Sequence, residues 1–121
     1  MALIVVVLAL GAASLPYLLR SRPERATGGV PEAIAPFGGA MRAGLTFRWT
    51  VPADDAPVRI ELFDATRGTL WRSEPDASGA LRPPASETAR WPAGDLLWRP
   101  VAVPPGEPER AGDLAAFVLL P

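Results

Sequence analysis

Hydrophobic and polar residues alternate along two stretches of the chain. In residues 45–51 the odd positions are apolar and the even positions are polar, and in residues 58–62 Arg59 and Glu61 alternate with Val58, Ile60 and Leu62. Successive side chains of a β-strand point to opposite faces of the sheet, so a period of two is typical of a half-buried strand. Both stretches are therefore predicted to be strands with one buried face.

Turn residues divide the rest of the polar region into further short segments. Residues 52–57 are expected to form a turn, and residues 64–68 a hairpin loop in which Gly68 adopts a positive φ. Short strands separated by turns, without a long amphipathic helix, predict an all-β, small antiparallel sandwich. The other expected elements are strands at 69–73, 80–82, 95–99 and 116–120, a continuation at 101–103, and one helical turn within 85–90.

The aromatic residues divide into a core group and a surface group. Trp49 and Trp98 are expected to pack in the core. Phe63 falls out of phase with Ile60 and Leu62, and exposed apolar side chains are typical of an interface. The sequence thus predicts a partner interface at four aromatic side chains: Phe37, Phe63, Trp71 and Trp91.

A different pattern opens the chain, where residues 2–19 carry no charge. Eighteen helical residues cover about 27 Å, close to the thickness of a hydrocarbon core. A cleaved signal peptide is the alternative, but it would need a basic segment before the apolar run, and none is present. The predicted anchor residues are Leu3, Ile4, Val7, Leu10, Leu15, Tyr17 and Leu18, followed by Arg20 and Arg22. We therefore expect a transmembrane anchor at 1–20, a Pro/Gly-rich linker at 21–40 and an interaction domain at 41–121.

Composition limits the chemistry that this chain can perform. It has 12 basic and 13 acidic side chains, without the basic excess of a nucleic-acid-binding protein, and it contains no Cys and no His. Zinc sites built from Cys or His, thiolate nucleophiles and Ser–His–Asp relays are thereby excluded. The adjacent carboxylates of Asp54 and Asp55 are expected to lie in a turn rather than to bind calcium. No catalytic residue, cofactor, metal or small-molecule substrate is predicted, and the chain is not expected to be an enzyme.

Five segments of the chain share a pattern of aromatic, apolar and turn residues: 36–39, 45–49, 60–64, 68–72 and 96–99. Together they resemble a known bacterial module, the fibronectin type III/immunoglobulin-like domain that follows the membrane helix in single-pass anti-sigma-factor-like proteins. The resemblance implies a bacterial cytoplasmic membrane protein with its domain in the periplasm, whereas the arginines after the anchor favour the cytoplasmic side. The zinc-finger half of that family is absent, and Pro100 replaces a usual β-branched residue, which predicts an edge strand or a bulge there.

Two functions remain open on these grounds. The first is a non-enzymatic, membrane-anchored accessory subunit that docks on a larger integral membrane protein complex and stabilises it. The alternative is a truncated anti-sigma-factor-like transmembrane regulator. In both, the expected partners are membrane lipid and protein, with no nucleic acid.

Overall fold

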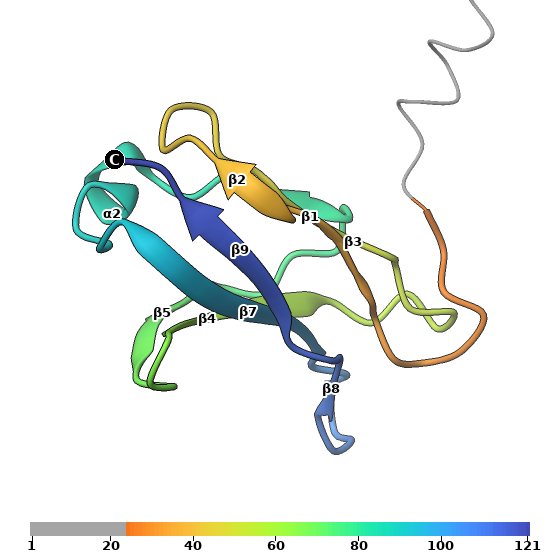
Figure 1. Cartoon of the computed structure of the whole chain (residues 1–121). Coiled ribbons are helices and arrows are strands. Elements are labelled where there is room, and N and C mark those ends of the chain that lie inside the picture. The colour runs from red at the N-terminus through yellow and green to blue at the C-terminus, as the bar shows by residue number, and fades with distance from the viewer. Residues whose placement is uncertain (1–23) are drawn as a thin grey trace, which may run out of the picture.

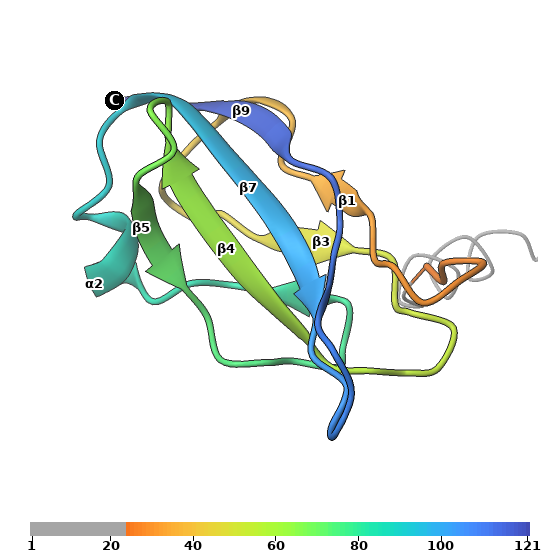
Figure 2. The same ribbon diagram turned by 90° about the horizontal axis from the view of Figure 1, so that it is seen from below.

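The computed structural model describes residues 24–121 as two β-sheets that face one another (Figures 1 and 2). The three-stranded sheet has the order β1–β3–β6, with β1 at Ala33–Ala35, β3 at Phe47–Trp49 and β6 at Ala80–Leu81. The six-stranded sheet has the order β2–β9–β7–β4–β5, and β8 also pairs with β7. Its strands are β2 (Gly38–Ala40), β4 (Val58–Asp64), β5 (Thr69–Arg72), β7 (Gly94–Ala102), β8 (Arg110–Ala111) and β9 (Ala115–Leu119). The all-β sandwich is thus confirmed, although β2 pairs with β9 in parallel.

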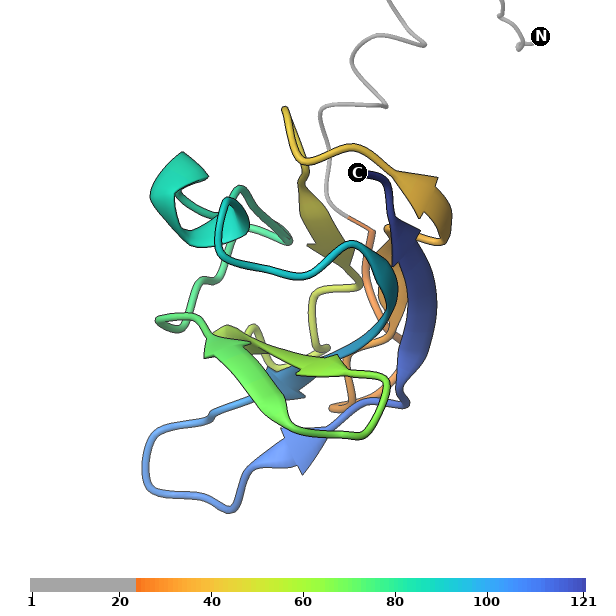
Figure 3. The same cartoon turned by 60° about the vertical axis from the view of Figure 1, so that its left-hand side comes forward.

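The loops and the single helical turn lie around this sandwich. Helix α2 (Ala85–Thr88) lies at the same end as the C-terminus, whereas the first described segment, in orange, lies at the opposite end (Figure 1). The β7–β8 hairpin projects beyond the sheets (Figure 3). The predicted helical turn within 85–90 is therefore confirmed.

The segment predicted to be a linker contributes strands to both sheets, which corrects the expected boundary at residue 41. Strand β1 pairs with β3 in one sheet, and β2 pairs with β9 in the other. The chain crosses between the sheets at the cis peptide bond of Ala35–Pro36. Proline and glycine break a regular period in sequence, but they do not prevent short edge strands from forming. For this reason the composition of residues 21–40 was misleading.

Aromatic side chains fill the space between the sheets. The ring of Phe47 is fully buried and lies 4.9 Å from that of Trp98 and 6.2 Å from that of Phe117, measured between centroids. Trp49 and Trp98 are 1% and 0% exposed, so the prediction that both belong to the core is confirmed. The indole N–H of Trp98 donates a hydrogen bond to the Pro36 carbonyl at 3.2 Å, which ties the segment between β1 and β2 to the core.

Pro100 does not lie at a sheet edge, and the prediction of an edge strand is wrong. It lies in β7, between β4 and the β8–β9 segment, opposite Ile60. The Ile60 N–H and C=O bond to Ser73 on the other side of β4. Pro100 and Ile60 are therefore a non-hydrogen-bonded pair of the antiparallel β4–β7 ladder. At such a position the missing N–H of proline breaks no hydrogen bond between the two strands. The Pro100 carbonyl accepts a bond from Gly112 at 2.7 Å on its other side.

The β4–β5 hairpin forms as predicted, but a different residue adopts the unusual backbone conformation. Arg67 has φ 70°, whereas Gly68 has no positive φ. Asp64 Oδ1 accepts hydrogen bonds from the Thr66 and Gly68 amides, both at 2.9 Å. A Cβ at Gly68 would lie 3.0 Å from Asp64 Oδ2, so this position is glycine because the carboxylate approaches closely.

The predicted membrane anchor lies outside the described residues. All nine anchor positions, from Leu3 to Arg22, precede Glu24. Within residues 24–121, no helix is long and apolar enough to cross a membrane.

Candidate interaction surface

The outward face of the six-stranded sheet carries an unusual set of side chains. Along β4, β7 and β9 the even-odd alternation sends one set of residues into the core and the other set outward. Strand register places Phe63 beside Leu97 and Leu97 beside Ala116. Val118 and Leu120, which are 39% and 42% exposed, continue this apolar area along β9. We call these five outward residues the apolar band: Phe63, Leu97, Ala116, Val118 and Leu120.

Next to the apolar band, a cluster of charged residues surrounds Glu61. The Glu61 carboxylate is hydrogen-bonded by Arg59 Nη2 at 2.8 Å and by Arg99 Nε at 3.0 Å, and Arg72 Nε lies 3.7 Å away. Arg59 also contacts Glu109 at 2.8 Å. The arginines come from three neighbouring strands, because β5 and β7 flank β4. We call Arg59, Arg72, Arg99, Glu61 and Glu109 the arginine cluster.

The arginine cluster keeps Glu61 ionised although that side chain is only 5% exposed. Burial alone would raise the pKa of Glu61, but hydrogen bonds from Arg59 and Arg99 outweigh it and hold the pKa below its ordinary value. The pKa of Glu109 is lowered in the same way, chiefly by its hydrogen bond from Arg59. The pKa of Arg59 is raised by Glu109 and Glu61. These charges are therefore fixed throughout the physiological pH range.

The arginine cluster and the apolar band meet at Arg99 and Phe63. The Arg99 guanidinium carbon lies 5.6 Å from the centroid of the Phe63 ring. A cation over an aromatic face is attracted by the ring quadrupole, and the planar guanidinium can still donate from its edges. The geometry thus holds Arg99 in place while it remains 37% exposed.

The four aromatic residues predicted to form a partner interface lie in different surroundings. Phe63 is half-buried on the outward face, and Phe37 is 55% exposed beside Val30 and Leu114 in a hollow of about 310 Å³. Trp91, however, is 3% exposed, so the prediction that it belongs to an exposed patch is wrong. It follows α2 and packs 5.6 Å from Trp71, which itself lies 6.2 Å from Phe47.

Trp71 faces inward because it pairs with Leu62. A bulge between Leu62 and Phe63 interrupts the regular alternation of β5, and both Leu70 and Trp71 pack against the core. The Trp91 indole donates to Glu87 at 3.2 Å. Both tryptophans therefore extend the core between β5 and α2, where their role is structural.

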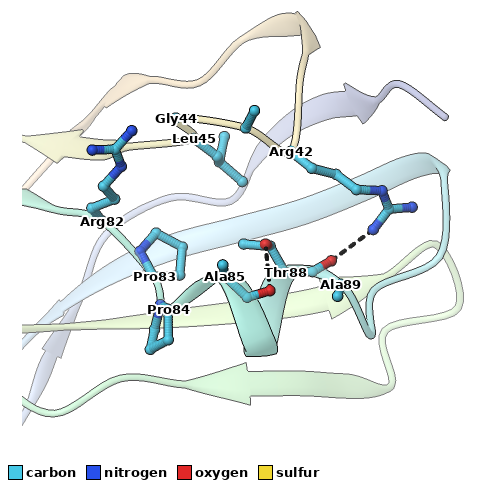
Figure 4. Close-up of a pocket in the computed structure, with 10 residues that line it drawn as sticks. Arg42, Gly44, Leu45, Arg82, Pro83, Pro84, Ala85, Thr88 and Ala89 are labelled. Carbon is cyan, nitrogen blue, oxygen red and sulfur yellow. Dashed lines mark hydrogen bonds between the residues drawn. The ribbon is translucent and has the colours of Figure 1, made fainter.

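A second hollow of about 640 Å³ lies at the C-terminal end of the sandwich, between the β2–β3 loop and α2 (Figure 4). Arg42 and Arg82 are its charged lining residues. Arg42 Nη1 donates to the carbonyls of Thr88 and Trp91 at 2.6 and 2.7 Å. Arg42 thus fastens the loop after α2 to the β2–β3 loop, which explains its position without a ligand.

Sequence reasoning missed the arginine cluster, although part of its signal is visible. The alternation in 58–62 places Arg59 and Glu61 on the outward face. The sequence does not say that β5 and β7 both flank β4, and this arrangement brings Arg72 and Arg99 to Glu61. Among residues 24–121, no group of three or more Asp or Glu side chains is placed to hold a metal ion.

No family model and no curated protein matches the sequence. Among solved structures, the fold is similar to the crystal structure of CopC from Methylosinus trichosporium OB3b, at 9% sequence identity and a TM-score of 0.46. The match covers 75% of this chain and 94% of that chain. The similarity extends to the course of the backbone alone and assigns neither a ligand nor an activity.

Proposed function

We propose that this protein is a non-enzymatic, membrane-anchored interaction subunit that docks on a larger membrane protein complex. The observation that carries the proposal is the way in which the chain enters the domain. The apolar run at 2–19 ends directly before a segment that is fixed on the sandwich. The anchor would therefore hold the domain close to the bilayer, where its partner would be a protein of the same membrane.

Backbone hydrogen bonds fix the entering segment. Val51 N–H donates to the Glu24 carbonyl at 2.7 Å, and Ala26 N–H donates to the Val51 carbonyl at 2.9 Å. Further along, Thr50 and Glu32 exchange two bonds of 2.9 Å, one through the Thr50 hydroxyl. The segment thus continues the outer edge of the three-stranded sheet before β1 begins.

Two ion pairs reinforce these hydrogen bonds. Arg25 Nη2 lies 2.6 Å from Asp55, and Arg110 Nη2 lies 2.6 Å from Asp54. Arg110 also donates through Nε to the Gly29 carbonyl at 2.8 Å. The hydrogen bond that Arg110 donates to Asp54 lowers the pKa of the Asp54 carboxyl. We call Arg25, Asp54, Asp55 and Arg110 the entry clamp. Asp54 and Asp55, which were predicted to lie in a turn, thus also form ion pairs with the entering segment and with Arg110.

The entry clamp leaves little free chain between the proposed anchor and the domain. Leu19 and Glu24 are five residues apart, and an extended chain of that length covers at most about 18 Å. A domain on so short a tether would stay at the membrane surface. Neighbouring membrane proteins would then meet it at a high effective concentration.

The architecture also supports the family resemblance as a proposal. Two facing sheets of short strands are the architecture of immunoglobulin and fibronectin type III domains. We therefore propose a domain of this kind on the periplasmic side of a bacterial cytoplasmic membrane. Sigma-factor binding is not part of the proposal, because the chain has no Cys or His with which to form the zinc finger.

Weakening the entry clamp should expose the segment after the anchor. In the double variant Asp54→Asn/Asp55→Asn, both ion pairs lose their charge, while each amide can still serve the turn as a hydrogen-bond acceptor. Exposed ion pairs stabilise a structure only weakly, so the effect should be modest, and trypsin should cleave after Arg25 about three- to tenfold faster. Timed proteolysis of the full chain in detergent, followed by mass spectrometry, measures this rate.

Asp113→Asn is the matched control, because Asp113 is exposed and forms no ion pair among residues 24–121. It should be cleaved at the wild-type rate. Equal rates for the double variant and the wild type would contradict a clamp held by these carboxylates.

Membrane attachment is tested by washing isolated membranes with alkaline carbonate. The full chain should stay in the pellet with integral proteins, since an inserted helix is not released by charge or pH. Release into the supernatant would overturn the anchor. Docking is tested separately by the size of the extracted species on a native gel.

A further inference from the structure

We propose that the outward face of the six-stranded sheet docks a protein segment that carries a carboxylate beside large apolar side chains. The inference rests on the proposed function and adds to it the docking face and the chemistry of the partner. The apolar band would receive the apolar side chains. Arg72 and Arg99 of the arginine cluster would receive the carboxylate.

The charge of the arginine cluster is opposite to that of the domain as a whole. Because Arg20 and Arg22 precede it, the described domain holds 10 of the 12 arginines and all 13 acidic residues, a formal charge of −3. The arginine cluster instead has three arginines and two carboxylates, a formal charge of +1. Asp95 lies on the same face beside Val118. A partner's carboxylate would therefore be repelled by the domain in general and by Asp95, and attracted at the arginine cluster, which favours one docking orientation.

Arg72 and Arg99 retain free donors for such a partner. Arg59 already binds Glu61 and Glu109 through all three of its nitrogens. Arg72 is 60% exposed and has no hydrogen bond among the described residues, while the side chain of Arg99 donates hydrogen bonds to Glu61 alone among them. The two lie on the strands that flank Glu61, so their backbones are separated by two strand spacings, or about 10 Å.

Glu61 makes these arginines suitable as anchors by orienting them before a partner binds. A flexible arginine loses side-chain freedom on binding, and this cost falls when the side chain is already held. Here the Glu61 carboxylate holds Arg99 from one side and the Phe63 ring supports it from below. Arginine and aromatic residues are both enriched at protein interfaces, and Arg99 and Phe63 combine the two.

The apolar band lies beside these arginines and is continuous across three strands. Phe63, Leu97 and Ala116 are in register, Val118 follows on β9 beside Asp95, and Leu120 comes directly after the strand. The outward face of β9 is not covered at these two residues, because β2 contributes Gly39 next to Val118. Glycine leaves that part of the face open, so a partner side chain can reach Val118.

The first experiment locates the face by photocrosslinking in native membranes. A benzophenone amino acid is placed in the full chain at Val118, and in a control chain at Ala80, an exposed residue of the three-stranded sheet. The Val118 probe should give one discrete protein adduct, and the Ala80 probe should not. Mass spectrometry of the adduct should find Asp or Glu within a few residues of the crosslinked site.

The second experiment tests the charge. Arg72→Glu should lower the yield of the Val118 adduct about tenfold, because an attractive pair becomes a repulsive one. Arg48→Glu makes the same charge change on the three-stranded sheet and should leave the yield unchanged. Near-ultraviolet circular dichroism checks that both variants fold, and Leu120→Arg serves as a second variant that removes apolar contact instead.

The outcomes separate this inference from the proposed function. A protein adduct at Ala80 but not at Val118 would overturn the docking face, while co-migration with a large complex would still support a subunit. Adducts to lipid, or to a second copy of this chain, would also overturn the proposed partner. If no large complex exists, the proposed function itself fails.

Discussion

Replacing Phe47 with alanine is expected to lower the free energy of unfolding by about 3–5 kcal/mol. The ring is fully buried and lies within 6.3 Å of four other aromatic rings, measured between centroids: those of Trp71, Trp91, Trp98 and Phe117. These neighbours come from three strands of the facing six-stranded sheet and from the segment after α2, so they cannot all move inward to fill the space. The cavity would therefore persist, and a cavity adds to the cost of the lost apolar contacts.

Such a loss is a large part of the stability of a small domain, which is about 5–15 kcal/mol in total. Urea titration followed by tryptophan fluorescence measures it. Phe37→Ala is the matched control, since Phe37 is 55% exposed and its removal should change the free energy of unfolding by only about 0.5 kcal/mol. Equal losses for the two variants would contradict the placement of Phe47 at the centre of the core.

Replacing Glu61 with glutamine is expected to lower the free energy of unfolding by about 2–3 kcal/mol. The amide has nearly the shape of the carboxylate, but it carries no charge, so Arg59, Arg72 and Arg99 lose their common partner. The expected loss is smaller than for a fully buried ion pair, because Arg72 and Arg99 are partly exposed to solvent. Glu109→Gln is the control and should cost much less than Glu61→Gln, since Glu109 is 56% exposed and solvent screens its charge.

The dependence on pH provides an independent readout for Glu61. Its pKa in the folded protein is lowered from 4.5, so its ionised form stabilises the fold above the unfolded pKa. This contribution is lost as the pH falls through the folded pKa. Urea titrations of the wild type and Glu61→Gln below pH 5 should therefore converge. A difference in stability that stays constant from neutral to acid pH would contradict the role of the charge.

Alternation predicted the central strands well because each has one buried and one exposed face. Strand β4 was expected from residues 58–62, and its inward residues are fully buried. The burial of Trp49 and Trp98 was predicted for the same reason. Local turn chemistry likewise identified the β4–β5 hairpin, since its hydrogen bonds lie within five residues of sequence.

The sequence could not predict features that depend on distant segments. The strands within residues 33–40 exist because β3 and β9 offer free edges, and neither edge is visible in the sequence of the segment itself. Trp91 is buried because α2 brings it against Trp71. Pro100 lies in the middle of a sheet because its missing N–H falls where the ladder has no bond.

The interaction surface was predicted only in part, for a similar reason. Phe63 was expected on the outward face by its phase in β4, and the structure places it there beside Leu97. The arginine cluster combines residues separated by up to 50 positions in sequence, such as Arg59 and Glu109. Only the strand order brings these residues together, so no local pattern could indicate the cluster.

The most direct test of the proposed function is the size of the species that contains this chain after mild detergent extraction of native membranes. Native gel separation and mass spectrometry of the band identify what travels with it. The account predicts co-migration with a large membrane protein complex at a fixed ratio. Migration as a small free species would contradict a subunit role.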